Sequence, residues 1–373
     1  MLQERRRLAP SPSTVAQAGD TRSDGGDRIT RIAVIVVNYR TPDLAIECLE
    51  ALDTAATAFD DVRAIVVDGG SADGSDSKIA QAIARRSSPV RASLLPLTVN
   101  GGFAFANNRA MLELASEGPL PDAIALINPD ARVRPGALES LAALLLRNPA
   151  AGAVGARLEH EDGRPQASAF TFPSVLGEFC RGARTRLIER LLRQPPTSII
   201  ADTAVETPWV TGAAVMFRTA ALVDAGLFDE GFFLYFEETD LLRRLRAHGW
   251  EIWHEPAARV VHQGGVATQI RDPETGLPAR RPIPRYWYES RRRYFALTGG
   301  NAYALVSGLA WLCGRLFWQA RCLVTGARDD GALRMTRDFI RYGLWPRSRD
   351  SQASVLDFGS AAPATPAWMS DPT

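Results

Sequence analysis

The sequence predicts an α/β fold in which helices cover both faces of a mostly parallel central sheet. Strand and helix patterns alternate along residues 31–147, as they do in consecutive βαβ units. The first strand, residues 32–37, is a continuous apolar and β-branched run, which is typical of a strand buried on both faces. Thr41, Pro42 and Asp43 follow as a helix-start signal, so a helix comes directly after the strand.

The remaining elements are predicted from apolar periodicity. Further strands are expected at residues 64–67, 93–97, 122–127, 250–254 and 259–262. Further helices are expected at residues 77–86, 104–116, 136–147, 218–225 and 237–248. An insertion at 158–207 precedes an apolar segment at 208–217. Because ligands of such sheets bind at the carboxyl ends of the strands, the turns after these strands are the expected site.

Composition and charge indicate a cytoplasmic protein that does not bind nucleic acid. A formal net charge of +1 gives no overall attraction to nucleic acid. The four cysteines lie far apart without metal-ligand spacing, which indicates reduced thiols in a cytoplasmic protein. The N-terminal residues lack the apolar stretch of a signal peptide. We divide the chain into a disordered tail at 1–28, a main domain at 29–280, a helical basic region at 281–350 and a disordered tail at 351–373.

Two segments carry an excess of arginine. Residues 178–193, in the insertion, are expected to form an amphipathic helix of net charge +3, and residues 280–347 have a local net charge of +9. An apolar run at 302–314 is too short to span a bilayer, which takes about 20 residues. Both segments fit contact with an anionic membrane or acceptor, at the inner face of the plasma membrane. Packing against the main domain also explains them, and both interpretations stay open here.

Four predicted strand ends carry polar clusters. They are Asn38-Tyr39-Arg40, residues 68–75, residues 100–108 and Asn128-Pro129-Asp130. One cluster of Asn, Asp, Gly and Ser is typical of an ordinary turn. Four clusters at one edge of a parallel sheet favour a binding cleft.

Three acids follow an aromatic run at residues 232–236. Glu237, Glu238 and Asp240 fall in the first turn of a predicted helix, where the helix dipole alone favours acids. Three acids in four positions beside aromatic side chains exceed that need. A carboxylate against an apolar wall has a raised pKa, which suits a general base. Glu237 and Asp240 share a helix face and Glu238 points about 100° away, so the three cannot all do the same job.

In their order along the chain these motifs resemble those of the family 2 glycosyltransferases, and most of all the bacterial rhamnosyltransferase-like branch that builds cell-surface polysaccharides. The resemblance covers residues 31–300 and rests on VIVVNYR (34–40), VVDxxSxDGS (66–75), NxGFAxxxN (100–108), NPD (128–130), WxxGA (209–213) and FDExFFxYxEExDL (228–241). It implies a GT-A-type, Rossmann-like nucleotide-binding fold. It also implies an inverting transfer from a nucleotide sugar to a surface glycan or lipid-linked acceptor. The branch suggests dTDP-rhamnose as donor, with UDP sugars behind it.

The resemblance further implies roles for single residues. Asp68 would accept a hydrogen bond from the base and Tyr39 would contact base or ribose, although Gly69 replaces the asparagine usual in the family. Asp130 and His262 would hold a divalent cation, Mn²⁺ or Mg²⁺, against the donor diphosphate. The other residues expected at the donor site are Asn38, Arg40, Asn100, Gly102, Phe103, Asn108, Asn128, Trp209 and Gly212.

Motif alignment makes Glu238 the implied base, with Asp240 and Glu237 as alternatives that would otherwise orient the acceptor or stabilise the helix. The alternative function is a degenerate, membrane-associated scaffold protein, which would have lost its metal and base positions. A P-loop nucleotidase is excluded because the chain has no Gly-rich loop ending in Lys-Ser or Lys-Thr, and Lys78 is its only lysine. The sequence leaves the oligomeric state open.

Overall fold

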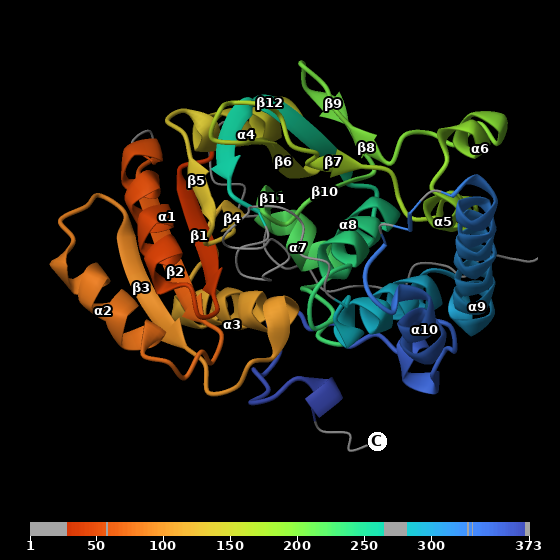
Figure 1. Cartoon of the computed structure of the whole chain (residues 1–373). Helices are drawn as coiled ribbons and strands as arrows, with labels where there is room; N and C mark the ends of the chain where they lie inside the picture. The colour runs from red at the N-terminus through yellow and green to blue at the C-terminus, as the bar shows by residue number, and fades with distance from the viewer. Residues whose placement is uncertain (1–27, 57–58, 265–281, 327, 330, 370–373) are drawn as a thin grey trace, which may run out of the picture.

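The computed structural model describes residues 28–56, 59–264, 282–326, 328–329 and 331–369, so the expected tail at 1–28 lies outside it except for Arg28. A nine-stranded mixed sheet forms the centre of the molecule (Figure 1). Its strand order is β3-β2-β1-β4-β11-β6-β12-β5, and β9 pairs with β12. Helices cover both faces of this sheet, as predicted.

One half of the sheet is wholly parallel. It consists of β1 (Arg31–Asn38), β2 (Asp61–Asp68), β3 (Arg91–Pro96) and β4 (Ala123–Ile127). The register pairs Asn38 at the end of β1 with Asp68 at the end of β2. This half agrees with the predicted strands and brings the polar turns to one edge.

The other half mixes strand directions. β11 (Ala214–Arg218) runs antiparallel to both β4 and β6 (Ala151–Glu159). The two strands predicted at 250–254 and 259–262 are one strand, β12 (Glu251–His262), with a bulge between Glu255 and Arg259. A short strand that the sequence did not indicate, β5 (Ala131–Val133), pairs with the end of β12. That pairing sets His262 opposite Ala131, next to Asp130.

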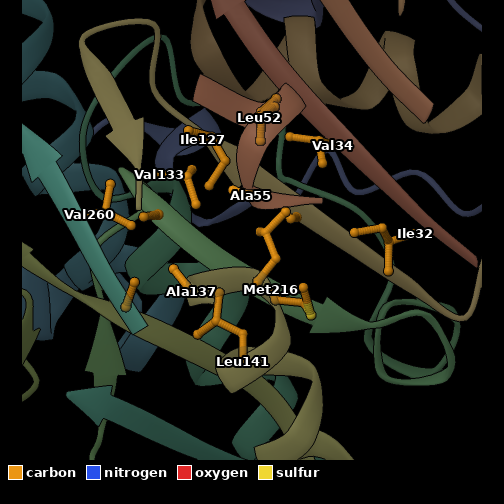
Figure 2. Packing of buried hydrophobic residues seen from close by; sticks show 14 of the residues in the cluster. Ile32, Val34, Leu52, Ala55, Ile127, Val133, Ala137, Leu141, Met216 and Val260 are labelled. Atoms are coloured by element: carbon orange, nitrogen blue, oxygen red, sulfur yellow. The ribbon is translucent and has the colours of Figure 1, made fainter. Parts of the chain in front are cut away.

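The two faces of the sheet carry separate cores. α1 (Pro42–Ala55), α2 (Ser75–Arg85) and α4 (Ala137–Arg147) pack on one face, and α3 (Gly102–Glu117), α7 (Thr219–Ala225) and α8 (Glu237–Ala247) on the other. Successive residues of β1 alternate between them, because strand side chains point to opposite faces. Figure 2 shows the first core, where Val34 and Ile127 from the parallel strands meet Leu52 of α1 and Leu141 of α4.

The insertion differs from its predicted form. The prediction of a single helix at 178–193 is wrong. The chain forms two helices there, α5 (Val175–Ala183) and α6 (Arg186–Leu191). Arg184, between them, is in the left-handed region at φ 49°. The insertion also supplies β7 (Ala169–Phe170) and β8 (Ser198–Ile199). With β10 (Trp209–Val210) they form a small antiparallel sheet, and β9 (Val205–Glu206) joins the large one.

The basic C-terminal region packs on the main domain. Its principal helix, α9 (Arg285–Thr325), is interrupted at Gly299 and Gly300, the latter at φ +81°. Short helices follow at Met335–Asp338, Phe339–Gly343, Ser348–Ser351 and Ala367–Met369. No helix in the described ranges combines the length and hydropathy needed to cross a bilayer.

Three consecutive arginines of α9 point inward. Arg291 donates to Glu178 at 2.7 Å, Arg292 to Asp350 and Arg293 to Asp229 at 2.7 Å. All three acids lie outside residues 280–347. The net charge of +9 therefore overstates the charge this region presents to solvent.

The prediction of a disordered tail at 351–373 is wrong for its described part. Leu227 donates its backbone N–H to the carbonyl of Leu356 at 2.8 Å, and Asp229 forms a β-bridge with Val355. Arg109 of α3 reaches the carbonyl of Pro363. The sequence of this segment has no apolar periodicity, yet backbone hydrogen bonds hold it and Leu356 and Phe358 pack against the second core. Residues 370–373 lie outside the described part.

Candidate active site

Asp68, at the end of β2, is 3% exposed and held in one orientation. Asn38 donates to its Oδ1 at 2.7 Å, and Ser71 donates both its hydroxyl to Oδ1 at 2.7 Å and its backbone N–H to Oδ2 at 3.0 Å. The carbonyl of the Asn38 side chain accepts from Thr41 at the start of α1. Both ends of the Asn38 amide are thus used within the protein. Asn38 therefore orients Asp68, and its contact with a donor stays a prediction.

Tyr39 and Arg40 lie in the turn after β1. Arg40 has φ 58°, its backbone N–H donates to Ser71 Oγ at 2.9 Å, and its guanidinium lies 5.1 Å from the centre of the Tyr39 ring. A β-carbon on Gly69 would lie 3.3 Å from the carbonyl oxygen of Asn38. The departure at Gly69 thus coincides with a tightly packed turn.

We call the sheet edge that carries Asp68 and Asp130 the donor edge, after its predicted role. Residues 100–103 join this edge to the aromatic run at residues 232–236. Gly102 has φ +89°, and a β-carbon there would lie 2.0 Å from the carbonyl oxygen of Phe233, so only glycine fits. Phe103 donates its backbone N–H to that carbonyl at 2.8 Å, while Asn100 Oδ1 accepts from Gly102. Two motifs 130 residues apart therefore form one wall.

Asn108 does not reach this cleft, contrary to expectation. Its side chain is fully buried, donates to the carbonyl of Phe228 at 2.9 Å and to Glu230 at 3.0 Å, and accepts from the backbone of Phe228 at 3.0 Å. Arg109 forms an ion pair with the same Glu230. Asn108 thus ties α3 to the segment that leads into the acidic helix.

Asp130 and His262 meet as predicted. His262 Nε2 lies 3.3 Å from Asp130 Oδ1, and Nδ1 lies 3.3 Å from Gln166 Oε1. Gln166 also donates to the backbone carbonyl of His262 at 2.6 Å. Gln166 Oε1 can accept a hydrogen bond from Nδ1 while Nε2 faces Asp130, which is the orientation that a metal-binding histidine needs. The side chain of Asn128, beside them, is half-buried.

The acidic helix begins under backbone strain. Tyr235 and Phe236 both have positive φ, 70° and 68°, which non-glycine residues rarely adopt. This turn starts α8 at Glu237 and sets the acids in its first turn. Glu238 lies close to Gly212 and Phe103. A β-carbon on Gly212 would be 3.6 Å from both the Glu238 β-carbon and the Phe103 ring.

Glu237 and Glu238 are short of partners. One carboxylate oxygen of each is buried without a hydrogen bond. Burial raises the pKa of Glu237 well above its usual value, and the neighbouring charge of Glu238 adds to the effect. Burial also raises the pKa of Glu238, although backbone N–H groups, that of Gly212 among them, oppose the rise. The pair can hold or accept a proton where an ordinary glutamate could not.

Asp240 has another environment. It is 1% exposed and forms ion pairs with Arg243 at 2.7 Å and Arg244 at 2.9 Å. Arg244 also donates to the backbone carbonyl of Leu227 at 2.7 Å. Asp240 therefore fixes α8 to the preceding loop, as one of the open alternatives had it.

Trp209 and Gly212 border the same wall. The Trp209 indole stacks on Phe170, with ring centres 4.5 Å apart, and donates its N–H to the carbonyl of Thr171 at 2.9 Å. One face of the indole is therefore already covered. A β-carbon on Gly212 would make only ordinary contacts, so close packing does not require glycine there.

A cavity of about 570 Å³ lies on the α9 side of the aromatic run. Phe233, Tyr286 and Trp368 line it, with the rings of the last two 5.1 Å and 5.6 Å from that of Phe233. Arg285 and Arg349 also line it, as do Glu289 and Asp350, and Arg285 forms an ion pair with Glu289 at 2.9 Å. Phe233 thus separates this cavity from the donor edge.

The structure adds residues that were not singled out from the sequence. Ser71 lies within a quoted motif, so the motif itself was its signal. Asp229 and Glu230 also lie in a motif, but their role appears only through Arg293 and Arg109. Gln166, in the insertion, has no sequence signal, because its contact with His262 depends on tertiary packing.

Comparison with known proteins identifies the family of the chain. Residues 30–281 match the family described as glycosyltransferase like family 2. The chain is 32% identical over 230 residues to N-acetylglucosaminyl-diphospho-decaprenol L-rhamnosyltransferase of Mycobacterium tuberculosis, over 58% of this chain and 71% of that protein. It is 35% identical over 68 residues to rhamnosyltransferase WbbL of Escherichia coli K12, over 18% of this chain and 25% of that protein.

Solved structures with a similar fold are more distant in sequence. Mannosyltransferase PcManGT from Pyrobaculum calidifontis, in complex with GDP-Man and Mn²⁺, is 17% identical with a TM-score of 0.49, over 80% of this chain and 76% of that one. Residues 1–349 of S. aureus TarS are 15% identical with a TM-score of 0.48, over 84% and 79%. The family match covers well over half of the chain, so the chain is a glycosyltransferase of family 2 with the GT-A-type α/β fold that the resemblance implied.

Proposed function

We propose that the chain transfers a sugar, with inversion, from a nucleotide sugar to a glycan or lipid-linked acceptor. The observation that carries the proposal is the pair of under-satisfied acids, Glu237 and Glu238, of which Glu238 lies beside Gly212 near Phe103. A scaffold protein has no need to keep buried carboxylates without partners, because they cost stability.

In the proposed reaction Glu238 takes the proton of the acceptor hydroxyl. That oxygen attacks the anomeric carbon of the donor while the bond from this carbon to the diphosphate breaks on the opposite side. The nucleoside diphosphate leaves with the electron pair, and the new glycosidic bond has the inverted configuration. The raised pKa of Glu238 suits a base that must accept a proton near neutral pH.

A divalent cation fits the residues at the end of β4. Asp130 and His262 offer one carboxylate and one imidazole nitrogen on adjacent strands, and Gln166 orients the imidazole. Among the described residues no group of three or more His, Cys, Asp or Glu side chains could hold a metal. Donor diphosphate oxygens and water would therefore complete the coordination, and a cation bound there would neutralise the charge of the leaving diphosphate.

The proposal assigns donor and acceptor to opposite sides of the aromatic run. Asp68 and Tyr39 take the nucleotide, and dTDP-rhamnose is the first donor to test because the relatives in M. tuberculosis and E. coli are named rhamnosyltransferases. The acceptor enters from the α9 side, where a cavity lined by aromatic rings and arginines suits a sugar that carries a phosphate group. A lipid-linked acceptor would place the enzyme at the inner face of the plasma membrane.

The proposal is tested with a panel of nucleotide sugars, each with Mn²⁺, Mg²⁺ or a chelator. We expect nucleotide release and a rise in melting temperature with dTDP-rhamnose and a divalent ion, and neither with the chelator. Stabilisation by a UDP sugar alone would keep the transferase and change the donor. Stabilisation without turnover on any lipid-linked acceptor would favour the scaffold alternative.

A further inference from the structure

The solvent-facing side of the second half of α9 is almost entirely apolar. We call it the α9 apolar face and define it by its large exposed residues, Val306, Leu309, Leu316, Phe317, Leu323 and Val324, which are 44–87% exposed. An exposed stretch of this size is unusual on a protein with no partner. The rest of the helix is buried through Trp311, Gly314 and Arg315.

The face is continuous along the helix. Ala302, Cys313 and Ala320 are also exposed and complete a stripe at positions 302, 306, 309, 313, 316, 320 and 323. Steps of three and four residues keep these positions on one side of an α-helix for about 32 Å, at 1.5 Å per residue. From residue 302 to 324 only Arg315 and Arg321 are charged, and Arg315 is buried in an ion pair with Asp329. The outward side therefore has one charged residue.

Exposed arginines lie within this part of α9 and in the segment that follows it in the sequence. Arg321, Arg328, Arg334, Arg337 and Arg341 are exposed. Between residues 302 and 341 the described acids are Asp329, paired with Arg315, and the half-buried Asp338. Two copies meeting through this face would bring arginines together without enough acids to pair them. An anionic lipid surface supplies the complementary charge.

A second apolar tip lies beside α9. α5 packs closely on α9, since a β-carbon on Gly182 would lie 2.3 Å from the carbonyl oxygen of Trp311. α6 follows α5, and its end exposes Leu191 (79%) between the exposed arginines Arg190 and Arg193. In Figure 1, α6 and α9 lie together at the end of the molecule opposite β3. The same combination of leucine and arginine thus occurs twice at this end.

We infer that the α9 apolar face lies in the plane of an anionic lipid surface, with its apolar side chains at the boundary of headgroups and acyl chains and its arginines on the headgroups. This inference rests on the proposed function only for its purpose, which is to hold the enzyme where a lipid-linked acceptor resides. The exposed apolar side chains of 302–324 and the exposed arginines carry this inference, and not the net charge of residues 280–347.

The test is flotation of the full chain with vesicles of phosphatidylcholine alone or mixed with phosphatidylglycerol. We expect binding to the anionic vesicles and weakening at high salt. The variant L316E/L323E should bind them on the order of tenfold less, because it places charge in the apolar boundary. V223E is the matched control, since Val223 is a similarly exposed apolar residue on α7 (53%), and it should bind like the wild type.

Three results would overturn the inference: no binding to anionic vesicles, equal binding by L316E/L323E, or a wild-type dimer that this variant dissociates without any vesicle binding. Stabilisation by nucleotide and Mn²⁺ measured on the same variants reports folding and the donor site separately. Arg321→Ser combined with Arg334→Ser is the second variant. It should lower binding to anionic vesicles and leave the fold intact, and unchanged binding would equally count against the inference.

Discussion

The acids at the donor edge and the acids at the start of α8 are held in opposite ways. Asp68 receives three hydrogen bonds from Asn38 and Ser71, and Asp130 faces His262, which Gln166 orients. Glu237 and Glu238 each keep a buried oxygen without a partner. Asp68 and Asp130 are held in place by protein partners, whereas the raised pKa values of Glu237 and Glu238 suit a change of protonation. Acids held for binding and acids suited to proton transfer thus occur in one site.

The acids that surround the unpaired ones strengthen this contrast. Asp229, Glu230 and Asp240 come from the same stretch of twelve residues, 229–240, and each forms an ion pair with an arginine. Every acid in this stretch except Glu237 and Glu238 is thus paired with an arginine. We interpret this selective pairing as a functional arrangement, since perturbed carboxyl groups gather at reactive sites.

The largest expected effect comes from Glu238→Gln, which keeps the shape of the base and removes its proton affinity. Transfer should fall by roughly 10²–10⁴-fold, the usual contribution of a general base. Stabilisation by nucleotide sugar and Mn²⁺ should persist, because Asp68, Asp130 and His262 are unchanged. Sugar transfer and melting temperature are measured on the same preparations.

Glu161→Gln, at an exposed position of the insertion, is the matched control and should keep full activity. Retained turnover in Glu238→Gln would move the base to Glu237, and the contrast between the two regions would then rest on the other unpaired acid. Loss of donor binding in this variant would instead show that Glu238 belongs to the donor site.

A smaller effect is expected from Gln166→Ala, which removes the orienting partner of His262. Second-layer partners of metal ligands are worth about 10–100-fold in metal affinity, so the Mn²⁺ concentration for half-maximal stabilisation should rise by that factor. Gln194→Ala, a glutamine of the same insertion near Gly177, is the control. An unchanged Mn²⁺ dependence would mean that His262 needs no such support.

The parallel half of the fold could be predicted because its signals are local. β-branched strands, the Pro-led start of α1 and the polar turns each lie within a few residues, and the edge rule for parallel sheets joins them. The short strand β5 escaped prediction because three residues carry no usable period. The helix break at Arg184 escaped because arginine gives no warning of a left-handed backbone.

The site was predictable where roles follow from position at a strand end, and not where they follow from packing. Asp130 and His262 lie side by side as expected. The side chains of Asn38 and Asn108 are buried and form hydrogen bonds with neighbouring loops. Both asparagines occur in the right motifs, so composition alone could not separate a ligand contact from a structural one. The arginines of α9 misled for the same reason, since their partners lie elsewhere in the sequence.

The smallest effect is expected on stability, from Glu237→Gln. Burial and the charge of Glu238 raise the pKa of Glu237 in the folded protein, so at intermediate pH the folded state holds a proton that the unfolded chain has lost. Stability therefore falls as pH rises from the usual glutamate pKa, near about 4.3, through the raised folded value. Glutamine has no proton to lose, so the variant should melt higher than the wild type at pH 8 and lose that advantage at pH 4.

Glu161→Gln serves again as control, because Glu161 is an exposed glutamate far along the chain from α8. The melting temperatures of the three proteins between pH 4 and pH 8, by calorimetry or dye binding, decide the matter. A gain for Glu237→Gln that stays constant with pH would come from packing and would weaken the contrast between the two regions. A gain that grows with pH would show that the start of α8 carries uncompensated charge, in contrast to the donor edge, where Asp68 and Asp130 have protein partners.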